Sequence, residues 1–186
     1  MAARDAGARA APETRLLTAS EVDAYVAFQK RVLALLGQAQ RDARGYADGG
    51  VAAQARLFAA LKVRAQQEDA ARRESGLGEA EIEMMDRLSQ AVLAKRAFAK
   101  SFDYDAQIRQ FQRVREKLPE AERARVEETL AALQRQKDRV LGLTEERDLF
   151  GGANVDLMLV REAELERTYE ATLELLGGPS KLPSGG

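Results

Sequence analysis

The chain has 186 residues and a formal net charge of −1, and it contains no histidine, cysteine or tryptophan. The balanced charge argues against nucleic-acid binding and against strong attraction to an anionic membrane. The missing histidine and cysteine remove the usual proton carrier near pH 7, the thiolate nucleophile and the two commonest zinc ligands. We therefore expect no catalytic residues, no cofactor, no bound metal ion and no enzymatic activity.

Composition predicts one soluble domain. Hydrophobic residues make up 45% and charged residues 32%, while aromatic residues make up only 5%, so the core must consist mainly of Leu, Val, Ala and Met. No apolar run is long enough to span a membrane. We expect a disordered N-terminal tail at 1–17, a single helical domain at 18–177 and a disordered C-terminal tail at 178–186.

The source and compartment are only weakly indicated. Arginine outnumbers lysine, which suggests a GC-rich bacterial genome. Residues 1–17 are small and polar, without the apolar segment of a signal peptide. The sequence leaves the compartment unknown: the protein is cytoplasmic, or exported if an upstream signal sequence has been removed.

The first predicted helix begins at a capping box. Thr18 and Glu21 stand three residues apart, as in the S/T-x-x-E pattern, so Thr18 is the predicted N-cap. The helix ends near Arg44, before a glycine-rich loop at 45–50. Its buried face is predicted from residues at helical spacing, all of them apolar except Gln29: Val22, Tyr25, Val26, Gln29, Val32, Leu33 and Leu36.

The second predicted helix runs from Val51 to Glu74 and ends at Gly76-Leu77 in a Schellman-type turn. Its inward-facing residues are predicted to be Ala55, Phe58, Leu61 and Ala65.

The middle of the chain predicts one long, bent helix over 79–117, because the apolar pattern continues almost in phase. Asp103 offers the alternative, a cap for a separate helix. Pro119 ends this segment and opens the next helix, over 120–141.

The last part of the chain predicts one further helix. Gly142-Leu143 resembles the ending at Gly76-Leu77, a short turn follows at 144–150, and Asn154 is the predicted N-cap of the final helix, which stops at Gly177.

Two polar residues fall at apolar positions of the helical pattern. Lys137 occupies such a position in the 120–141 helix, and Glu162 does so in the last helix. If these helices are antiparallel neighbours, the two side chains can meet as a buried pair. The alternative, which we favour, places Lys137 at the rim and Glu162 at the edge of the core.

Charge is unevenly distributed. Residues 95–139 carry 12 Lys/Arg and 8 Asp/Glu, whereas residues 140–178 carry 3 and 9. We expect the acidic last helix to lie against the basic helices before it, although a basic surface offered to a partner is the alternative. A glutamate row at 162, 166, 170 and 174 is interpreted as a solvated face rather than a calcium site.

The predicted fold is all-α: a five- or six-helix up-down bundle with two long helices and short glycine-containing connections. The first helix carries apolar residues over a wider arc than one neighbour covers. The candidate interaction face is Tyr25, Phe28, Val32 and Leu35.

The leading functional hypothesis is a non-catalytic module that acts through protein contact with a partner or through self-association. The second hypothesis is a bundle of the bacterial cell envelope that binds a small apolar or lipid-like ligand, which requires a cavity near the Ala-rich second helix. An enzyme that uses carboxylates ranks last, because it requires a deep pocket with at least two acids of raised pKa.

Overall fold

The computed structural model describes residues 15–44 and 51–177, and every regular element in these ranges is an α-helix. The all-α prediction is therefore confirmed. The 45–50 loop and the predicted tails, apart from residues 15–17, lie outside the described residues. The helices are α1 (Ala19–Arg44), α2 (Val51–Ser75), α3 (Glu79–Ser101), α4 (Tyr104–Lys117), α5 (Glu120–Leu141), α6 (Thr144–Phe150), α7 (Gly152–Val160) and α8 (Glu162–Leu175).

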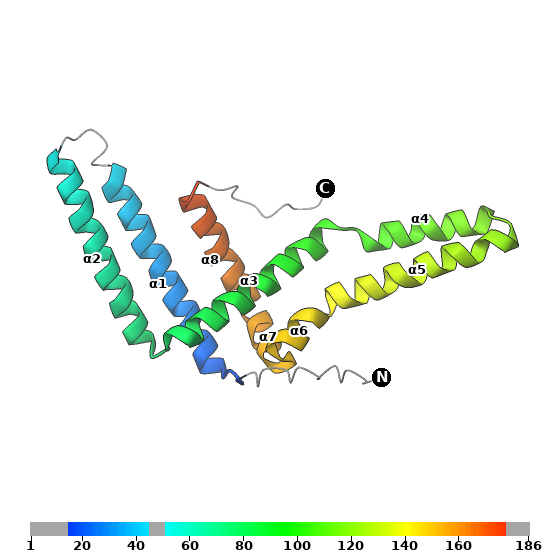
Figure 1. The fold of residues 1–186 in the computed structure, drawn as a ribbon, viewed down its shortest axis with the longest axis horizontal. Helices are drawn as coiled ribbons and strands as arrows, with labels where there is room; N and C mark the ends of the chain where they lie inside the picture. Colours follow the sequence, from blue (N-terminus) through cyan, green and yellow to red (C-terminus); the bar gives the residue numbers. More distant parts are fainter. Residues whose placement is uncertain (1–14, 45–50, 178–186) are drawn as a thin grey trace, which may run out of the picture.

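The helices form two arms that diverge from a junction, in place of the predicted single up-down bundle (Figure 1). In one arm, α1 and α2 form a hairpin and α8 lies beside α1. α3 crosses the base of this arm and leads to the second arm, the α4–α5 hairpin. α4 packs mainly against α5. The helices of the two arms therefore do not share one core, as the predicted single bundle required.

The core lies at the junction of the arms. Met85 and Leu88 of α3 and Val155 and Met158 of α7 have no measurable exposure. Val22 and Tyr25 of α1 complete the contact and are 1% and 2% exposed. Full burial of such side chains contributes about 1.5–3 kcal/mol each. α3 is thus held between α1 and α7, and both arms start from this contact.

The helix ends that depend on local capping are confirmed. The Glu21 carboxylate accepts a hydrogen bond of 2.7 Å from the Thr18 backbone N–H, and Thr18 Oγ1 accepts one of 3.3 Å from the Glu21 N–H. Gly76 adopts a left-handed φ of 72°, and its N–H bonds the Arg73 carbonyl. α5 has the predicted bounds.

The predicted long helix over 79–117 is wrong, because the chain breaks at Phe102-Asp103. The Asp103 side chain accepts a 2.7 Å hydrogen bond from the Ala106 N–H and caps α4. Phe102 leaves the helical conformation with its ring 4.4 Å from that of Tyr104. The alternative, in which Asp103 caps a separate helix, is the correct one.

Three further details of the last third of the chain differ from prediction. The 144–150 turn is the short helix α6, and the final helix is divided at Arg161 into α7 and α8. At 142–143, Leu143 rather than the glycine is left-handed, with a φ of 53°. Gly142 is required for space instead, because a Cβ there would lie 2.8 Å from the Asp138 carbonyl oxygen.

Asn154 is not an N-cap. It lies inside α7 and is only 1% exposed. Its side chain forms a hydrogen-bonded clasp around residues 15–17, the segment that precedes α1. Its Oδ1 accepts a 2.8 Å hydrogen bond from the Leu17 N–H, and its Nδ2 donates to the Arg15 and Phe150 carbonyls, both at 2.9 Å. These hydrogen bonds tie residues 15–17, the last part of the predicted N-terminal tail, to α7.

The predicted inward face of α2 is also wrong. Ala55, Phe58, Leu61 and Ala65 are exposed, with Phe58 at 72%. α2 packs mainly on α1 and buries the small side chain of Ala71 near its C-terminal end. A helix with one principal neighbour leaves much of its apolar surface uncovered.

Substitution of Asn154 by alanine is expected to lower the free energy of unfolding by about 2–4 kcal/mol, because buried polar groups left unsatisfied cost about 1–3 kcal/mol each. Denaturant unfolding monitored by circular dichroism measures this change. Gln134→Ala, which removes one exposed side-chain hydrogen bond to Asp138, is the control and should stay within about 0.5 kcal/mol of the parent. Equal effects of the two substitutions would show that the clasp is unimportant.

Candidate functional site: a cleft with an acidic wall

Lys137 and Glu162 do not meet. Lys137 Nζ lies 2.7 Å from Asp105 of α4, whereas Glu162 accepts a 2.9 Å hydrogen bond from Arg96 Nε of α3. The reason is that α6 and α7 separate α5 from α8, so the two helices are not the antiparallel neighbours that the hypothesis required. Both side chains are partly exposed, in keeping with the rim and edge positions that we favoured.

The acidic last helix pairs with basic residues of α3. Besides the Arg96–Glu162 pair, Lys100 Nζ lies 2.8 Å from Glu166. The expectation that the acidic helix lies against the basic helices of 95–139 therefore holds only for the C-terminal part of α3, because α4 and α5 belong to the other arm and do not pack on α8. Two members of the glutamate row therefore bind cations of α3.

The candidate interaction face is divided between the core and a cleft. Tyr25 is buried, while Phe28, Val32 and Leu35 are partly exposed. Tyr25, Phe28 and Val32 line the same cleft, and Leu35 is not among its lining residues. The wide apolar arc on α1 thus forms part of a concave surface rather than a flat face.

The cleft lies between α1, α2, α8 and the crossing helix α3, and has a volume of about 760 Å³. Its frame is fixed by contacts along α1 and α8. Lys30 Nζ lies 2.6 Å from Glu164, and Gln40 Nε2 donates to the Leu175 carbonyl at 2.7 Å. The contact nearer the C-terminus of α1 is also the one nearer the C-terminus of α8, so the two helices run parallel.

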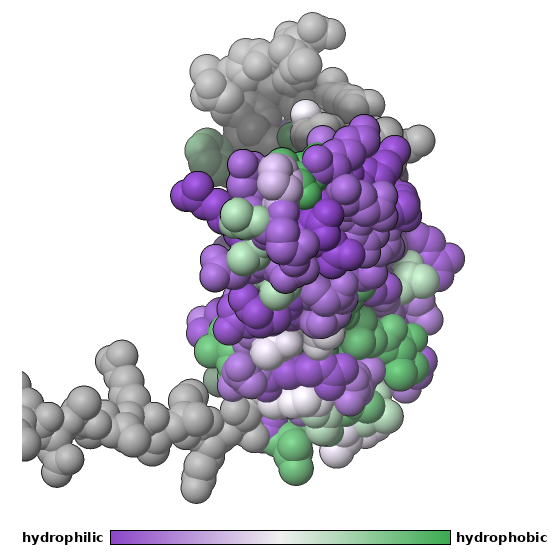
Figure 2. All heavy atoms as spheres, turned by 90° about the vertical axis from the view of Figure 1, so that its right-hand side faces the viewer, coloured by the Kyte–Doolittle hydropathy of each residue, from purple (hydrophilic) through white to green (hydrophobic). Residues whose placement is uncertain are grey.

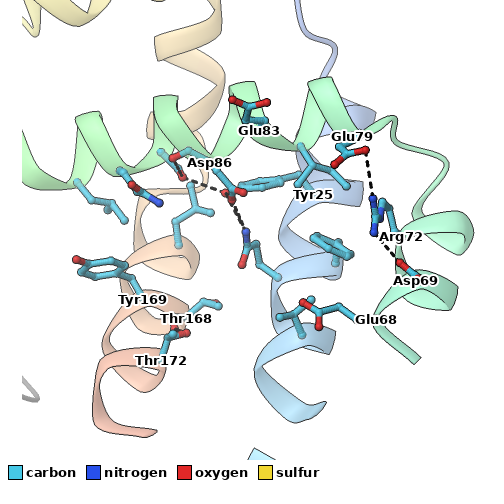
Figure 3. Close-up of a pocket in the computed structure, with 18 of the residues that line it drawn as sticks. Tyr25, Glu68, Asp69, Arg72, Glu79, Glu83, Asp86, Thr168, Tyr169 and Thr172 are labelled. Atoms are coloured by element: carbon cyan, nitrogen blue, oxygen red, sulfur yellow. Dashed lines mark hydrogen bonds and ion pairs between the residues drawn. The ribbon is translucent and has the colours of Figure 1, made fainter. Parts of the chain in front are cut away.

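The walls of the cleft differ in chemistry (Figure 3). Its floor is apolar, its α8 side carries hydroxyl groups, and its α2 and α3 sides carry five carboxylates and one guanidinium. The apolar residues are Phe28, Val32, Ala65, Ile82, Leu93 and Leu165; the hydroxyl residues of α8 are Thr168, Tyr169 and Thr172; the charged residues are Glu68, Asp69, Arg72, Glu79, Glu83 and Asp86.

Asp86 is the centre of a hydrogen-bonded cluster at the base of the cleft. Its Oδ1 accepts 2.6 Å hydrogen bonds from the Tyr25 hydroxyl and from Gln29 Nε2. The Tyr25 oxygen also lies 3.0 Å from Ser89 Oγ. Burial raises the pKa of the Asp86 carboxyl above its ordinary value, although the two hydrogen bonds oppose this shift. Burial and the bond to Asp86 raise the pKa of the Tyr25 hydroxyl as well.

Sequence reasoning missed this cluster, but one signal for it was present. Gln29 is the polar member of the apolar template in the first helix. A polar side chain at such a position requires a partner when it is buried. Asp86 carried no comparable signal, because it lies on a charged helix with many exposed acids.

Arg72 neutralises only one end of the acidic wall. Its guanidinium lies 2.6 Å from Asp69 and 3.7 Å from Glu79. Asp86 receives hydrogen bonds from neutral donors and forms no ion pair with a described residue. The inner part of the wall therefore keeps an uncompensated negative charge.

The far end of the second arm differs from the cleft in chemistry. Figure 2 looks toward the free end of the α4–α5 arm, where the surface is mostly hydrophilic with scattered apolar side chains. No helix among the described residues combines the length and hydropathy needed to cross a membrane. Within the same residues, no group of three or more acidic side chains is arranged to hold a metal ion.

Comparison with known proteins adds no assignment: no family model matches the chain, and neither a curated protein nor a solved structure resembles it significantly.

Lys137→Met and Glu162→Leu are expected to change stability independently, since their side chains contact different helices. A double-mutant cycle from denaturant melts should give a coupling energy within about 0.5 kcal/mol of zero. The Arg96–Glu162 cycle serves as the positive comparison. Coupling between Lys137 and Glu162 of 1 kcal/mol or more would contradict the observed arrangement.

The charge on Asp86 is expected to reduce stability as the pH rises. Its folded-state pKa lies above the ordinary value of 3.8, so between these two values the folded chain holds more protons than the unfolded chain. The free energy of unfolding must then fall as the pH increases through that window. Asp86→Asn removes this contribution. Denaturant melts should show the variant gaining stability relative to the parent as the pH rises from 3.8 through the higher folded-state pKa of Asp86, and the opposite trend would contradict the assignment.

Proposed function

We propose that this protein is a non-catalytic interaction module that binds a helix of a partner protein in the cleft between α1, α2, α3 and α8. The observation that supports this proposal is the cleft itself, with an apolar floor on α1 bordered by polar walls. Amphipathic helices bind proteins by laying an apolar face into such a groove.

The frame of the cleft suits a helical occupant. α1, α2 and α8 form one layer, with α2 and α8 on either side of α1. A helix laid on the open side of this layer would complete a four-helix arrangement of the usual kind. The apolar residues of the floor, from Tyr25 to Val32, cover two helical turns, or about 10 Å.

A small apolar or lipid-like ligand is the second candidate, because the sequence hypothesis required a cavity near the second helix. Ala65 of α2 lines the cleft, and its volume of about 760 Å³ lies within the range of small-molecule sites. The native mass of freshly purified protein distinguishes the candidates: a retained small molecule favours the ligand, and a bare monomer favours the helix-binding module.

Ala65→Trp is expected to block helix binding, because it places a large side chain in the cleft from an exposed position. Helical peptides selected from a display library against the parent protein should bind this variant at least tenfold more weakly. Ala59→Trp is the matched control, since Ala59 is exposed on the same helix and lies outside the cleft lining.

Thermal melts should place both tryptophan variants within about 1 kcal/mol of the parent. If the selected peptides bind the Ala65 and Ala59 variants equally well, the cleft is not the helix-binding site and the proposal is wrong.

A further inference from the structure

The cleft holds a negative charge that no cationic side chain of the described residues neutralises. Asp86 is half-buried, and its hydrogen-bond donors, Tyr25 and Gln29, are both neutral. Glu83 of α3 also lines the cleft and is exposed, with its carboxylate directed away from the Asp86 cluster (Figure 3). Arg72 lies toward the opposite end, bound to Asp69 and Glu79. A half-buried carboxylate without a cation is costly, and a cation delivered by a ligand would remove that cost.

We propose that the helix bound in the cleft is basic and amphipathic, and that one of its Lys or Arg side chains binds the Asp86 carboxylate. This inference rests on the proposed function and specifies the chemistry of the partner. The apolar face of the helix packs on Phe28, Val32 and Leu165, and its cationic flank faces α3.

The asymmetry of the walls fixes how the helix is turned. The α2 and α3 sides are acidic, whereas the α8 side presents Thr168, Tyr169 and Thr172. The hydroxyls of Thr168 and Thr172 already donate to the carbonyls of Glu164 and Thr168 at 2.9 and 2.8 Å. They remain acceptors only. The flank of the helix toward α8 therefore carries polar hydrogen-bond donors, and its basic residues lie on the opposite side of the apolar stripe, toward the acidic α2 and α3 walls.

The charge on Asp86 has the character of a binding group. Burial raises the pKa of its carboxyl, so the ionised form lowers the stability of the free protein near neutral pH. Functional groups are often retained at such a cost to stability. A bound ammonium or guanidinium would turn the same charge into a favourable, charge-assisted contact.

Three hydrocarbon-stapled helical peptides test the inference with the full chain. They share one leucine stripe and carry Lys, Gln or Glu at the flanking positions. Titration by fluorescence anisotropy should give the tightest binding for the Lys peptide, intermediate binding for the Gln peptide and the weakest for the Glu peptide. Each step should be about tenfold or more, as expected for one charge-assisted hydrogen bond.

Two variants locate the charge. Asp86→Asn keeps the shape of the side chain and its acceptor oxygen. It should lower the affinity for the Lys peptide about tenfold and leave the affinity for the Gln peptide unchanged. Asp148→Asn removes an exposed carboxylate of α6 outside the cleft and should change neither. If Asp86→Asn unfolds the chain, Glu83→Lys at the exposed position should weaken the Lys peptide and strengthen the Glu peptide.

The contrary outcomes separate the two proposals. Equal binding of all three peptides, abolished in each case by Ala65→Trp, would leave the cleft as a helix site and overturn the inference about charge. Failure of every peptide to bind would overturn both proposals. A dimer of the protein that Ala65→Trp dissociates would show that the occupant is a second copy, and would overturn the inference of a basic partner.

Discussion

The packing of α3 between α1 and α7 is the contact on which the rest of the structure depends. Met85 and Leu88 meet Val155 and Met158 there without exposure to solvent, and Tyr25 closes the contact from α1. Both arms begin at this junction: α1, α2 and α8 on one side, and the α4–α5 hairpin on the other. Asn154 hydrogen-bonds the backbone of Arg15 and Leu17, and the Leu17 side chain joins the same core, so three parts of the chain that are distant in sequence are fixed together.

The cleft is a consequence of this arrangement. Because α3 crosses only the base of the first arm, the apolar side of α1 beyond the crossing remains uncovered between α2 and α8. The crossing also brings Asp86 and Glu83 of α3 to the edge of that apolar floor. The exposed apolar area of the floor and the half-buried carboxylate of Asp86 each raise the free energy of the unbound protein. One class of occupant removes both costs: a helix with one apolar and one basic face.

The sequence predicted those features that are set by local chemistry. The capping box at Thr18, the break before Pro119 and the bounds of α5 each depend on a few adjacent residues, and each was found correctly. The apolar pattern continues nearly in phase across the breaks at Phe102 and Arg161. For this reason the break at Phe102 was only the alternative prediction, and the break at Arg161 was missed. The N-cap prediction for Asn154 is wrong because an asparagine side chain can hydrogen-bond a neighbouring backbone segment, here residues 15–17, as well as the first turn of a helix. The buried face of α2 could not be predicted, because its Ala-rich sequence contains no clear apolar stripe.

The candidate site was predictable only in part. The wide apolar arc of α1 pointed to Tyr25, Phe28 and Val32, and three helices then enclose them. The acidic wall was not predictable, because the packing of α3 across α1 is a tertiary relation without a sequence signature. For the same reason the sequence pattern allowed a contact between Lys137 and Glu162, whose helices belong to different arms.

Native-state hydrogen exchange tests the central claim that the junction holds both arms. We expect the slowest amides at Met85–Val92 of α3 and Val155–Met158 of α7, with opening free energies that approach that of global unfolding. Amides in the outer half of the α4–α5 hairpin should exchange through smaller, local openings. If those outer amides are protected as strongly as the ones in α3 and α7, the junction is not the element on which the fold depends.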